Sequence, residues 1–440
     1  MKVLLLDVYK KNVDYRISKD TNGSYGTGND YGDSLFAKFL KKISKRTNFW
    51  PPLYLMYTGS VLREKGHEVK YSNQIIDLDH YDAIIMSSSI VCHETEINTI
   101  KEIKDKSKVI VIGSFASNSS KHYVDEGVKV IKGEPEFYFS HNSLNNLMQA
   151  EEKEFSTTTN YIDDLDSLPF PCWDLVIDHL AFSGSIKRKK CIPILAERGC
   201  PYSCFNYCTY PLEQGRKPRS RSNTNIVEEM GYWVEKFNIN EFIFRDPVFS
   251  INREKTIQLA EMIIKADIKV KFTIETHLNN LDYELITKLK EAGMFFIQCG
   301  VESVDEDVMK DAKRFSLKKG AEIEKINMLR KAGIKVMGMY ILGYESDTRE
   351  SCLATINYAK ELNTNIAVFS IFTPYPGTPV YISFKNRITA TQYEDYNQWN
   401  PVFEHKNLTK KEIRTLLTFA FDSYYLSPKW FIKNLIRQLV

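Results

Sequence analysis

The stretch from residue 191 to residue 211 reads CIPILAERGCPYSCFNYCTYP, an apolar run followed by a loop with three cysteines. The run 192–196 has the composition of a buried strand, whereas Pro, Tyr, Asn and Gly among the cysteines are typical of a loop. Cysteine occupies 8 of 440 positions, so three within nine residues are rare by chance and need a chemical explanation. We therefore expect a metal or cluster site on Cys200, Cys204 and Cys208, directly after a strand.

A regular alternation of strands and helices continues from this stretch. Apolar residues at helical spacing in 225–238, and the helix stops Ala292-Gly293 and Ala332-Gly333, separate the expected strands. Those strands are 192–196, 241–245, 268–274, 294–300, 334–341 and 366–371. Six such units with right-handed crossovers predict a partial (βα)6 barrel, in which sites lie at the carboxyl ends of the strands. The cysteine loop follows the first strand, where such a site is expected.

The first 140 residues repeat the alternation in a separate unit. A helix is expected from Pro52 to the stop at Gly66. Apolar strands are expected at 2–8, 82–87, 108–113 and 128–131. This pattern predicts an α/β fold with a doubly wound, Rossmann-like domain over residues 1–140, in which 10–50 form a long loop or lid. The other divisions that we expect are a connector over 141–190, the barrel over 191–384 and a helical C-terminal extension over 385–440.

The composition is that of a folded protein without a polyanionic partner. The chain is 43% hydrophobic and 26% charged, which excludes a disordered chain, and its formal net charge of +3 gives no reason to expect nucleic acid. No apolar run approaches the roughly 20 residues that span a bilayer, and the N-terminal run is too short for a signal peptide. We therefore expect a cytoplasmic location. The basic, amphipathic tail 430–440 fits packing against the barrel or peripheral contact with a membrane surface, and both stay open.

Three thiolates on one short loop match a [4Fe–4S] cluster, because they hold three of its irons and leave the fourth open. A structural zinc site usually takes four ligands in two close pairs. No second pair occurs here, and the nearest other cysteine, Cys191, lies on the strand side. Inert buried thiols are the other alternative, but the polar loop composition disfavours them. The residues thus favour a cluster whose open iron can chelate an amine and a carboxylate.

The segments Gly199–Cys204 and Asn206–Cys208 resemble the signature loop of radical S-adenosylmethionine (SAM) enzymes. The usual spacing is Cys-x3-Cys-x2-Cys, whereas the second gap here holds three residues, 205–207. Because both flanks match, we interpret the extra residue as a bulge in the loop. The resemblance implies an enzyme that cleaves SAM reductively, yielding a 5′-deoxyadenosyl radical. It also implies an external one-electron reductant such as flavodoxin or ferredoxin.

The same resemblance implies SAM contacts at the ends of successive barrel strands. Asp246 ends the second strand, where the family meets the SAM amino group, although a structural turn with an Asp cap is the alternative. Glu302 ends the fourth strand, where a carboxylate suits the two ribose hydroxyls. Residues 337–345 look like the fifth-strand motif that packs on adenine in the family, and Gly338 and Gly343 let the backbone approach a flat base. The full set of expected SAM contacts is Tyr207, Asp246, Glu302, Gly338, Tyr340 and Gly343.

The N-terminal domain resembles the cobalamin-binding domain that is often fused to this barrel. Small polar residues at parallel strand ends make a shallow floor that can receive a corrin. The expected cobalamin contacts are Ser87, Ser88, Ser89, Gly113, Ser114, Gly133 and Glu134. The chain lacks the Asp-x-His-x-x-Gly motif that supplies a lower cobalt ligand in other cobalamin proteins. A domain used for packing alone is the alternative.

Together the two resemblances imply a cobalamin-dependent radical SAM methyltransferase that acts on an unactivated carbon of a small molecule or biosynthetic intermediate. A radical SAM cyclase, rearrangement enzyme or oxidase without methyl transfer has the same architecture. A cluster-binding or cobalamin-binding protein without turnover is a third hypothesis. It predicts that the cluster binds but that SAM is not cleaved.

Overall fold

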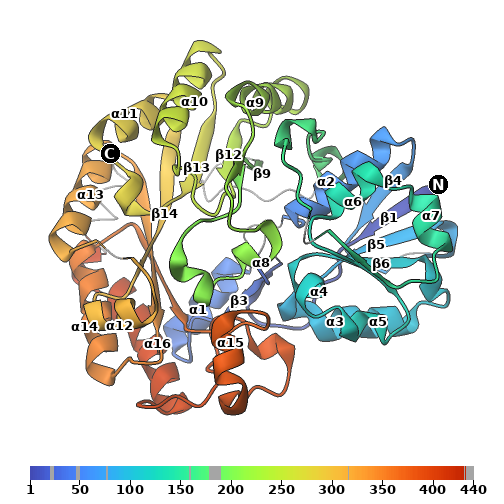
Figure 1. Cartoon of the computed structure of the whole chain (residues 1–440). Coiled ribbons are helices and arrows are strands. Elements are labelled where there is room, and N and C mark those ends of the chain that lie inside the picture. The colour runs from blue at the N-terminus through green and yellow to red at the C-terminus, as the bar shows by residue number, and fades with distance from the viewer. Residues whose placement is uncertain are drawn as a thin grey trace.

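The structure of the chain is a computed structural model, and it describes residues 1–19, 24–45, 50–75, 78–157, 160–177, 190–315, 317–430 and 432. Two six-stranded parallel sheets form its two halves, the N-terminal one on the right of Figure 1 and the barrel on the left. Within these ranges no helix is both long and apolar enough to cross a membrane. Most of the tail 430–440 lies outside the described residues, so its expected membrane contact does too.

The N-terminal sheet has the strand order β4-β1-β5-β6-β7-β8. Its strands are β1 Lys2–Leu6, β4 Glu68–Ser72, β5 Ala83–Ser87, β6 Val109–Ile112, β7 Lys129–Lys132 and β8 Glu154–Ser156. Its helices are α2 Leu53–Glu64, α3 His93–Glu102, α4 Ser114–Asn118, α5 Lys121–Val124, α6 Pro135–His141 and α7 Leu144–Gln149. Every residue of β5 and β6 is buried, as expected for parallel strands covered on both faces. The doubly wound domain is confirmed, and β8 adds a strand that the sequence pattern did not reveal.

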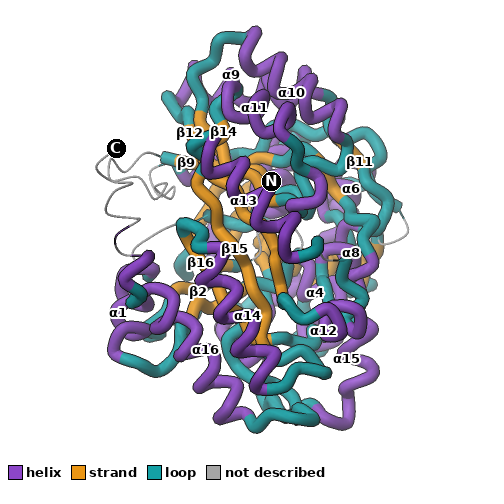
Figure 2. The backbone as a smooth tube through the Cα atoms, turned by 90° about the vertical axis from the view of Figure 1, so that its left-hand side faces the viewer, coloured by secondary structure: helices purple, strands orange, loops and turns teal. Residues whose placement is uncertain are grey.

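The barrel sheet runs β16-β15-β14-β13-β12-β9, so its strands are neighbours in chain order. They are β9 Cys191–Ile194, β12 Glu241–Phe244, β13 Lys271–Glu275, β14 Met294–Glu302, β15 Lys335–Leu342 and β16 Ile366–Ile371. The outer helices are α9 Asn223–Phe237, α10 Arg253–Lys265, α11 Tyr283–Glu291, α12 Glu306–Asp311, α13 Lys319–Lys331 and α14 Arg349–Leu362. Figure 2 shows these helices around the strands. All six expected strands are confirmed, and the barrel is partial because β9 and β16 are not paired with each other.

Residues 10–50 contain regular structure, which corrects the expectation of a long loop. An antiparallel pair, β2 Arg16–Ser18 with β3 Thr27–Asn29, precedes α1 Leu35–Ser44. The Ser34 hydroxyl caps α1 by accepting a hydrogen bond from the Ala37 N–H. The segment packs beside α16 Lys410–Tyr425, which lies next to α1 in Figure 2. It therefore covers one side of the barrel.

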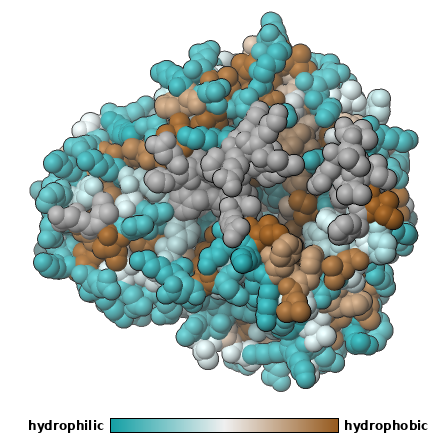
Figure 3. Space-filling view, turned by 180° about the vertical axis from the view of Figure 1, so that it is seen from behind, coloured by the Kyte–Doolittle hydropathy of each residue, from teal (hydrophilic) through white to brown (hydrophobic). Residues whose placement is uncertain are grey.

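The remaining short elements lie between the two sheets and at the mouth of the barrel. They are β10 Glu197–Arg198, α8 Tyr210–Gln214, β11 Arg219–Ser220 and α15 Pro379–Phe384. Seen from behind, the surface carries mainly hydrophilic side chains with hydrophobic ones in scattered patches (Figure 3). This distribution is ordinary for a folded protein.

Buried ion pairs join the two halves. Arg219 lies 2.7 Å from a Glu134 carboxylate oxygen, and Arg198 lies 3.1 Å from the same oxygen and 2.8 Å from Glu136. All four side chains are at most 5% exposed. Removing one member would leave a buried charge without its partner, which typically costs about 3–5 kcal/mol. The N-terminal domain is thereby fixed against the barrel.

The outer layer contains a buried carboxyl group that makes stability depend on pH. Glu322 on α13 accepts a hydrogen bond of 2.7 Å from the Tyr358 hydroxyl on α14, and burial raises its pKa to about 7. The folded protein then binds more protons than the unfolded chain between pH 4.5 and 7, so stability falls as pH rises through this window.

We expect Glu322→Gln to remove this dependence, because the amide has no charge to desolvate. Relative to the wild type, the variant should gain about 2–3 kcal/mol of stability between pH 5 and pH 8. Thermal unfolding at both pH values measures the difference. Glu324→Gln, on the exposed side of the same helix, is the control. An equal pH response in wild type and Glu322→Gln would contradict the assignment.

Candidate active site

The cysteine loop is closed at its base by a short antiparallel pairing. Glu197 pairs with Ser220 and Arg198 with Arg219, so both ends of the loop are held side by side. Gly199 follows at φ +87°, where a Cβ atom would lie 2.3 Å from the Lys217 carbonyl oxygen. Only glycine fits this turn without displacing backbone atoms.

The second half of the loop is a helical turn. The Cys204 carbonyl accepts hydrogen bonds of 3.1 Å from both the Tyr207 and the Cys208 N–H groups. The bond from Cys208 has the i→i−4 pattern of an α-helix, so Cys204 and Cys208 share one face of the turn. The extra residue in the second gap is therefore accommodated as helix, and the two flanking thiols still point to the same side.

The three thiols line one cavity of about 130 Å³, together with Tyr207, Glu302 and Arg314. Burial raises the pKa of Cys208, and Cys204 and Cys200 raise it further, so the sulfur atoms are mutual electrostatic neighbours. Among the described residues, no three Cys, His, Asp or Glu side chains converge on a point that would hold a single metal ion. The ligands of a [4Fe–4S] cluster sit on three different irons and need no such common point. The three thiols of this cavity are ligands of the kind that such a cluster takes from a protein.

An ion pair lies directly beside the thiols. A guanidinium N–H of Arg314 points at the Cys204 sulfur over 3.7 Å, and another guanidinium nitrogen lies 3.3 Å from Glu302. Burial lowers the pKa of Arg314, but the Glu302 carboxylate, the Cys204 thiol and two nearby tyrosine hydroxyls together outweigh burial and raise the pKa above its usual value. In this cavity the Glu302 carboxylate can bind an amine or hydroxyl groups of a ligand, and the Arg314 guanidinium can bind a carboxylate. This donor set fits the polar groups of SAM.

A second charged pair continues the polar lining away from the thiols. Glu275, at the end of β13, lines the same cavity and lies 3.6 Å from Arg245 at the end of β12. His277 also lines it, with its Nδ1 accepting from the Asn279 N–H and its Nε2 3.2 Å from the Phe315 carbonyl. Burial lowers the pKa of His277 to about 4, so the ring is neutral at pH 7. With both nitrogens engaged, His277 holds the rim in place.

The comparisons with known proteins agree with this geometry. The model of the radical SAM superfamily matches residues 196–359. This chain contains a radical SAM domain. Residues 196–359 contain the cysteine loop and four of the six barrel strands, β12 to β15.

Relatives of this radical SAM enzyme match it over most of its length. An uncharacterized methyltransferase of Pyrococcus horikoshii is 26% identical, over 90% of this chain and 92% of that protein. An anaerobic magnesium-protoporphyrin IX monomethyl ester cyclase of Cereibacter sphaeroides is 24% identical, over 87% of this chain and 68% of the cyclase. The solved radical SAM methyltransferase TsrM of Kitasatospora setae, with cobalamin and a [4Fe–4S] cluster bound, has a TM-score of 0.60 and 15% identity. The structural match includes 88% of this chain and 78% of the TsrM chain, which shows that the two proteins share the two-part fold.

The structure places the expected SAM residues of this enzyme in different environments. Tyr207 and Glu302 line the cysteine cavity. Gly338 and Tyr340 face the helix layer, where the Tyr340 ring stacks on Phe369, and Met339 between them lines the cavity instead. Gly338 can therefore contact SAM only through its backbone atoms, and the Tyr340 ring points away from the cysteine cavity. Both contacts stay predictions.

The other two expected SAM residues hold turns. Asp246 is buried, and one of its carboxylate oxygens accepts hydrogen bonds from the N–H groups of Ala196 and Glu197. Its neighbours Pro247 and Val248 line the cavity. Gly343, at φ +79°, donates its N–H to Asp347 over 2.9 Å. The structure thus supports the capping alternative for Asp246, and direct SAM contact by either residue stays a prediction.

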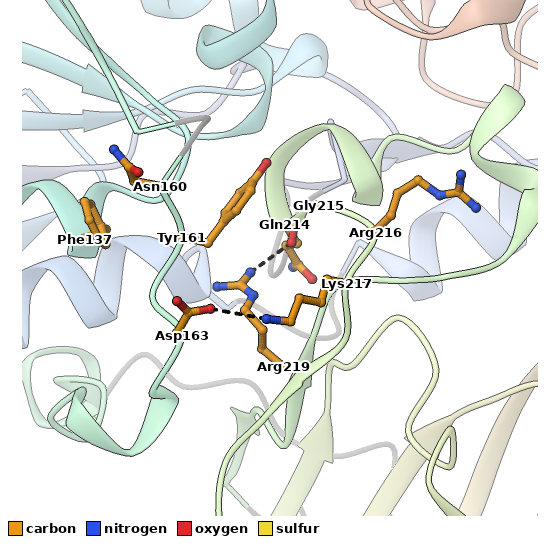
Figure 4. A pocket seen from close by; sticks show the side chains of 9 residues that line it. All are labelled: Phe137, Asn160, Tyr161, Asp163, Gln214, Gly215, Arg216, Lys217 and Arg219. Carbon is orange, nitrogen blue, oxygen red and sulfur yellow. Dashed lines mark hydrogen bonds and ion pairs between the residues drawn. The ribbon is translucent and has the colours of Figure 1, made fainter.

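The back of the cysteine loop is braced by the segment that follows it. The Gly215 carbonyl accepts a hydrogen bond from Cys200 N–H, and Arg216 donates to the Pro201 carbonyl over 2.8 Å. A surface cavity of about 430 Å³ lies behind this brace (Figure 4). Figure 4 shows Tyr161 beside Arg219, whose guanidinium lies 4.9 Å from the ring centre, and Lys217 paired with an aspartate. The contacts of Gly215 and Arg216 with the loop backbone hold its first half in place.

The expected cobalamin residues lie at one edge of the N-terminal sheet, as predicted, but they are covered by the chain itself. The serines and Glu134 are at most 2% exposed. The Ser87 hydroxyl donates to Asp7 over 2.6 Å, and the buried Lys19 ammonium lies 3.1 Å from it. A Cβ on Gly113 would lie 2.4 Å from the Tyr54 hydroxyl.

The space left at this edge is small. The cavity beside Glu134 and Arg198 measures about 20 Å³, which holds roughly one water molecule. In this closed arrangement a corrin does not fit, and it would need the residues around Lys19 to move away. The seven expected contacts therefore stay predictions.

The sequence pattern missed Arg314, Glu275 and Met339, although all three line the cysteine cavity. Met339 lies on an expected strand and Glu275 directly follows one, and the inward orientation of their side chains was not assigned. Arg314 lies in a connection after α12, three residues beyond the helix, where no periodic signal marks it. Arg314 lies between α12 and α13, in the crossover that follows β14, and a charged residue in that crossover was the available clue.

We expect Gly199→Ala to prevent stable cluster assembly, because the added Cβ would collide with the Lys217 carbonyl at the base of the loop. The loop would have to move, and the three thiols would lose their common cavity. Iron and sulfide content after anaerobic reconstitution measures this loss. Gly231→Ala is the matched control, since nothing lies within 4 Å of a Cβ at that helical position. Equal iron content in both variants would contradict the role of Gly199.

Proposed function

We propose that this radical SAM enzyme is a methyltransferase that acts on an unactivated carbon of a small molecule and uses cobalamin as its methyl carrier. The observation that carries the proposal is the single cavity that holds Cys200, Cys204 and Cys208 together with the Glu302–Arg314 pair. A barrel fused to an α/β domain, and relatives named as methyltransferases, support methyl transfer. A bound cluster would supply the electron for reductive cleavage of SAM.

The chain's own residues have definite roles in this proposal. Cys200, Cys204 and Cys208 hold the cluster, and Arg314 donates toward the Cys204 sulfur, which favours the thiolate. Glu302 and Arg314 orient the polar end of SAM. Tyr344, which is buried, and Tyr207, which is partly buried, close the cavity on its other side and exclude water.

The compartment and the partners are further parts of the proposal. All eight cysteines are free thiols, which suits the reducing cytoplasm. A one-electron donor such as flavodoxin or ferredoxin would reduce the cluster. Cobalamin would bind at the strand ends that carry Ser87 and Gly113 once the segment around Lys19 moves away.

A cyclase is the second candidate, favoured by the similarity to the magnesium-protoporphyrin ester cyclase. The two candidates differ in the product, because methylation adds one carbon to the substrate whereas ring closure adds none. Product mass with SAM carrying a labelled methyl group distinguishes them.

We expect the protein, reconstituted anaerobically with iron and sulfide, to form 5′-deoxyadenosine from SAM and dithionite. Alanine at Cys200, Cys204 or Cys208 should each abolish the product and most of the bound iron, because a missing thiolate leaves an iron without its ligand. Cys352→Ala, at a buried cysteine outside the cavity, is the matched control and should keep both.

The same preparation tests the other parts of the proposal. If the protein binds a cluster but forms no deoxyadenosine, the enzyme assignment is overturned and the hypothesis of a cluster-binding protein without turnover is favoured. Deoxyadenosine without retained hydroxocobalamin would overturn the cobalamin-dependent methyltransferase and favour the cyclase.

A further inference from the structure

A second cavity, of about 440 Å³, lies on the outer side of the cysteine loop. It is bordered by α12 and α15, which both lie in the lower part of Figure 1, and by the connection after β15. Its wall includes Asn206, Val308, Tyr344, Phe372, Val380 and Phe384. The volume is within the range of small-molecule pockets, which is about 300–1,000 Å³.

One layer of aromatic side chains separates this outer cavity from the cysteine cavity. Tyr207 lines the cysteine cavity and Tyr344 lines the outer one, and their hydroxyl oxygens are 3.3 Å apart. The Tyr207 ring centre lies 5.6 Å from that of Phe372, another wall residue of the outer cavity. Burial raises the pKa of both tyrosines well above the usual value, so the layer is neutral.

The lining of the outer cavity indicates what it accepts. Its inner wall consists of Tyr344, Phe372, Val380 and Phe384, all at most 7% exposed. Charged groups stand at the rim, where the Lys406 ammonium lies 2.8 Å from Glu345. An apolar wall with polar groups at one end suits a molecule with an apolar body and a polar end. The volume is far too small for a corrin with its side chains.

The three-residue gap of the cysteine loop contributes side chains to both cavities. Asn206 and Tyr207 are consecutive, yet Asn206 lines the outer cavity and Tyr207 the cysteine cavity. The helical turn between Cys204 and Cys208 produces this, because consecutive residues on a helix point about 100° apart. The three-residue gap therefore lets the loop form part of both walls.

We propose that the outer cavity is the substrate pocket and that it takes a small molecule with an apolar body and a polar end. The apolar body lies against Phe372 and Phe384, and its reacting carbon faces the Tyr207–Tyr344 layer. One of these rings turns aside to admit that carbon to the cysteine cavity. This inference rests on the proposed function for the reaction, but the pocket itself can be tested without turnover.

The test uses 8-anilinonaphthalene-1-sulfonate, an apolar probe with an anionic end, and the cluster-loaded protein. We expect saturable binding with one probe per chain. Ala312→Trp fills the outer cavity from the end of α12 and should weaken the probe's affinity about tenfold or more. Val380→Asp is the second variant, and it should weaken binding by placing a charge on the apolar wall. Far-ultraviolet circular dichroism and thermal unfolding establish that each variant is folded.

Ser423→Trp is the matched control, because Ser423 lines a separate cavity of about 510 Å³ beside Trp430. This control should leave the affinity unchanged. Unchanged binding in folded Ala312→Trp and Val380→Asp, or equal weakening by Ser423→Trp, would overturn the proposal.

A second measurement tests the distance between the probe and the cluster. The probe 8-anilinonaphthalene-1-sulfonate is bound to the wild type, and the relaxation of its aromatic protons is recorded by NMR with the cluster oxidised and reduced. We expect faster relaxation with the paramagnetic reduced cluster and loss of this effect in Ala312→Trp. Relaxation that does not respond to reduction would place the probe away from the cysteine loop and overturn the proposal. Deoxyadenosine formation by the wild type reports separately on the proposed function.

Discussion

The whole arrangement depends on the short pairing of Glu197–Arg198 with Arg219–Ser220, which closes the cysteine loop at its base. A loop that must present three thiols to one cluster loses less conformational entropy on binding when its ends are already joined. The side chains of Arg198 and Arg219 both reach Glu134 in the N-terminal domain. The contact that shapes the loop is therefore also the contact that fixes the two halves of the molecule. A shift between the halves would move the base of the loop as well.

This coupling bears on the covered edge of the N-terminal sheet. Lys19 lies there fully buried, 2.8 Å from Glu96 and 3.4 Å from Asp7, so the edge is closed by charges that neutralise one another. Nearby, the Tyr25 hydroxyl donates to the Pro376 carbonyl at the mouth of the barrel, over 2.9 Å. A large ligand at this edge has to displace a paired buried cation and a contact with the barrel. The ion pairs of Lys19 and the hydrogen bond of Tyr25 therefore stabilise the closed edge and the contact between the two halves together.

Much of the fold could be predicted from sequence, because each barrel strand is an apolar run of the right length between helical patterns. The cysteine loop could be predicted because its residue types and spacing are rare. The sequence did not predict which face of β15 points into the barrel. Both faces of Lys335–Leu342 are mainly apolar, so the alternation of side chains along the strand does not distinguish the inward face from the outward one. The structure of residues 10–50 could not be predicted from the hydrophobic pattern either, because β2 and β3 have only three residues each. Contacts with distant parts of the chain hold them, such as the hydrogen bond from the Gly28 N–H to the Asn397 carbonyl. The position of Arg314 depends on how the connection between α12 and α13 packs, and no local sequence pattern predicts that packing.

The spacing of the cysteines shows how a departure from a motif can be absorbed without loss of geometry. Cys200, Cys204 and Cys208 are four residues apart in each step, and a helical turn brings the last two to the same side. An insertion that extended the loop as irregular chain would have moved Cys208 away from the other thiols. Formed as helix, it places Asn206 in the wall of the outer cavity and keeps Cys204 and Cys208 on one face of the turn. The residue that departs from the usual spacing thus becomes part of the wall between the cluster and the outer cavity, where it can influence which molecule reaches the cluster.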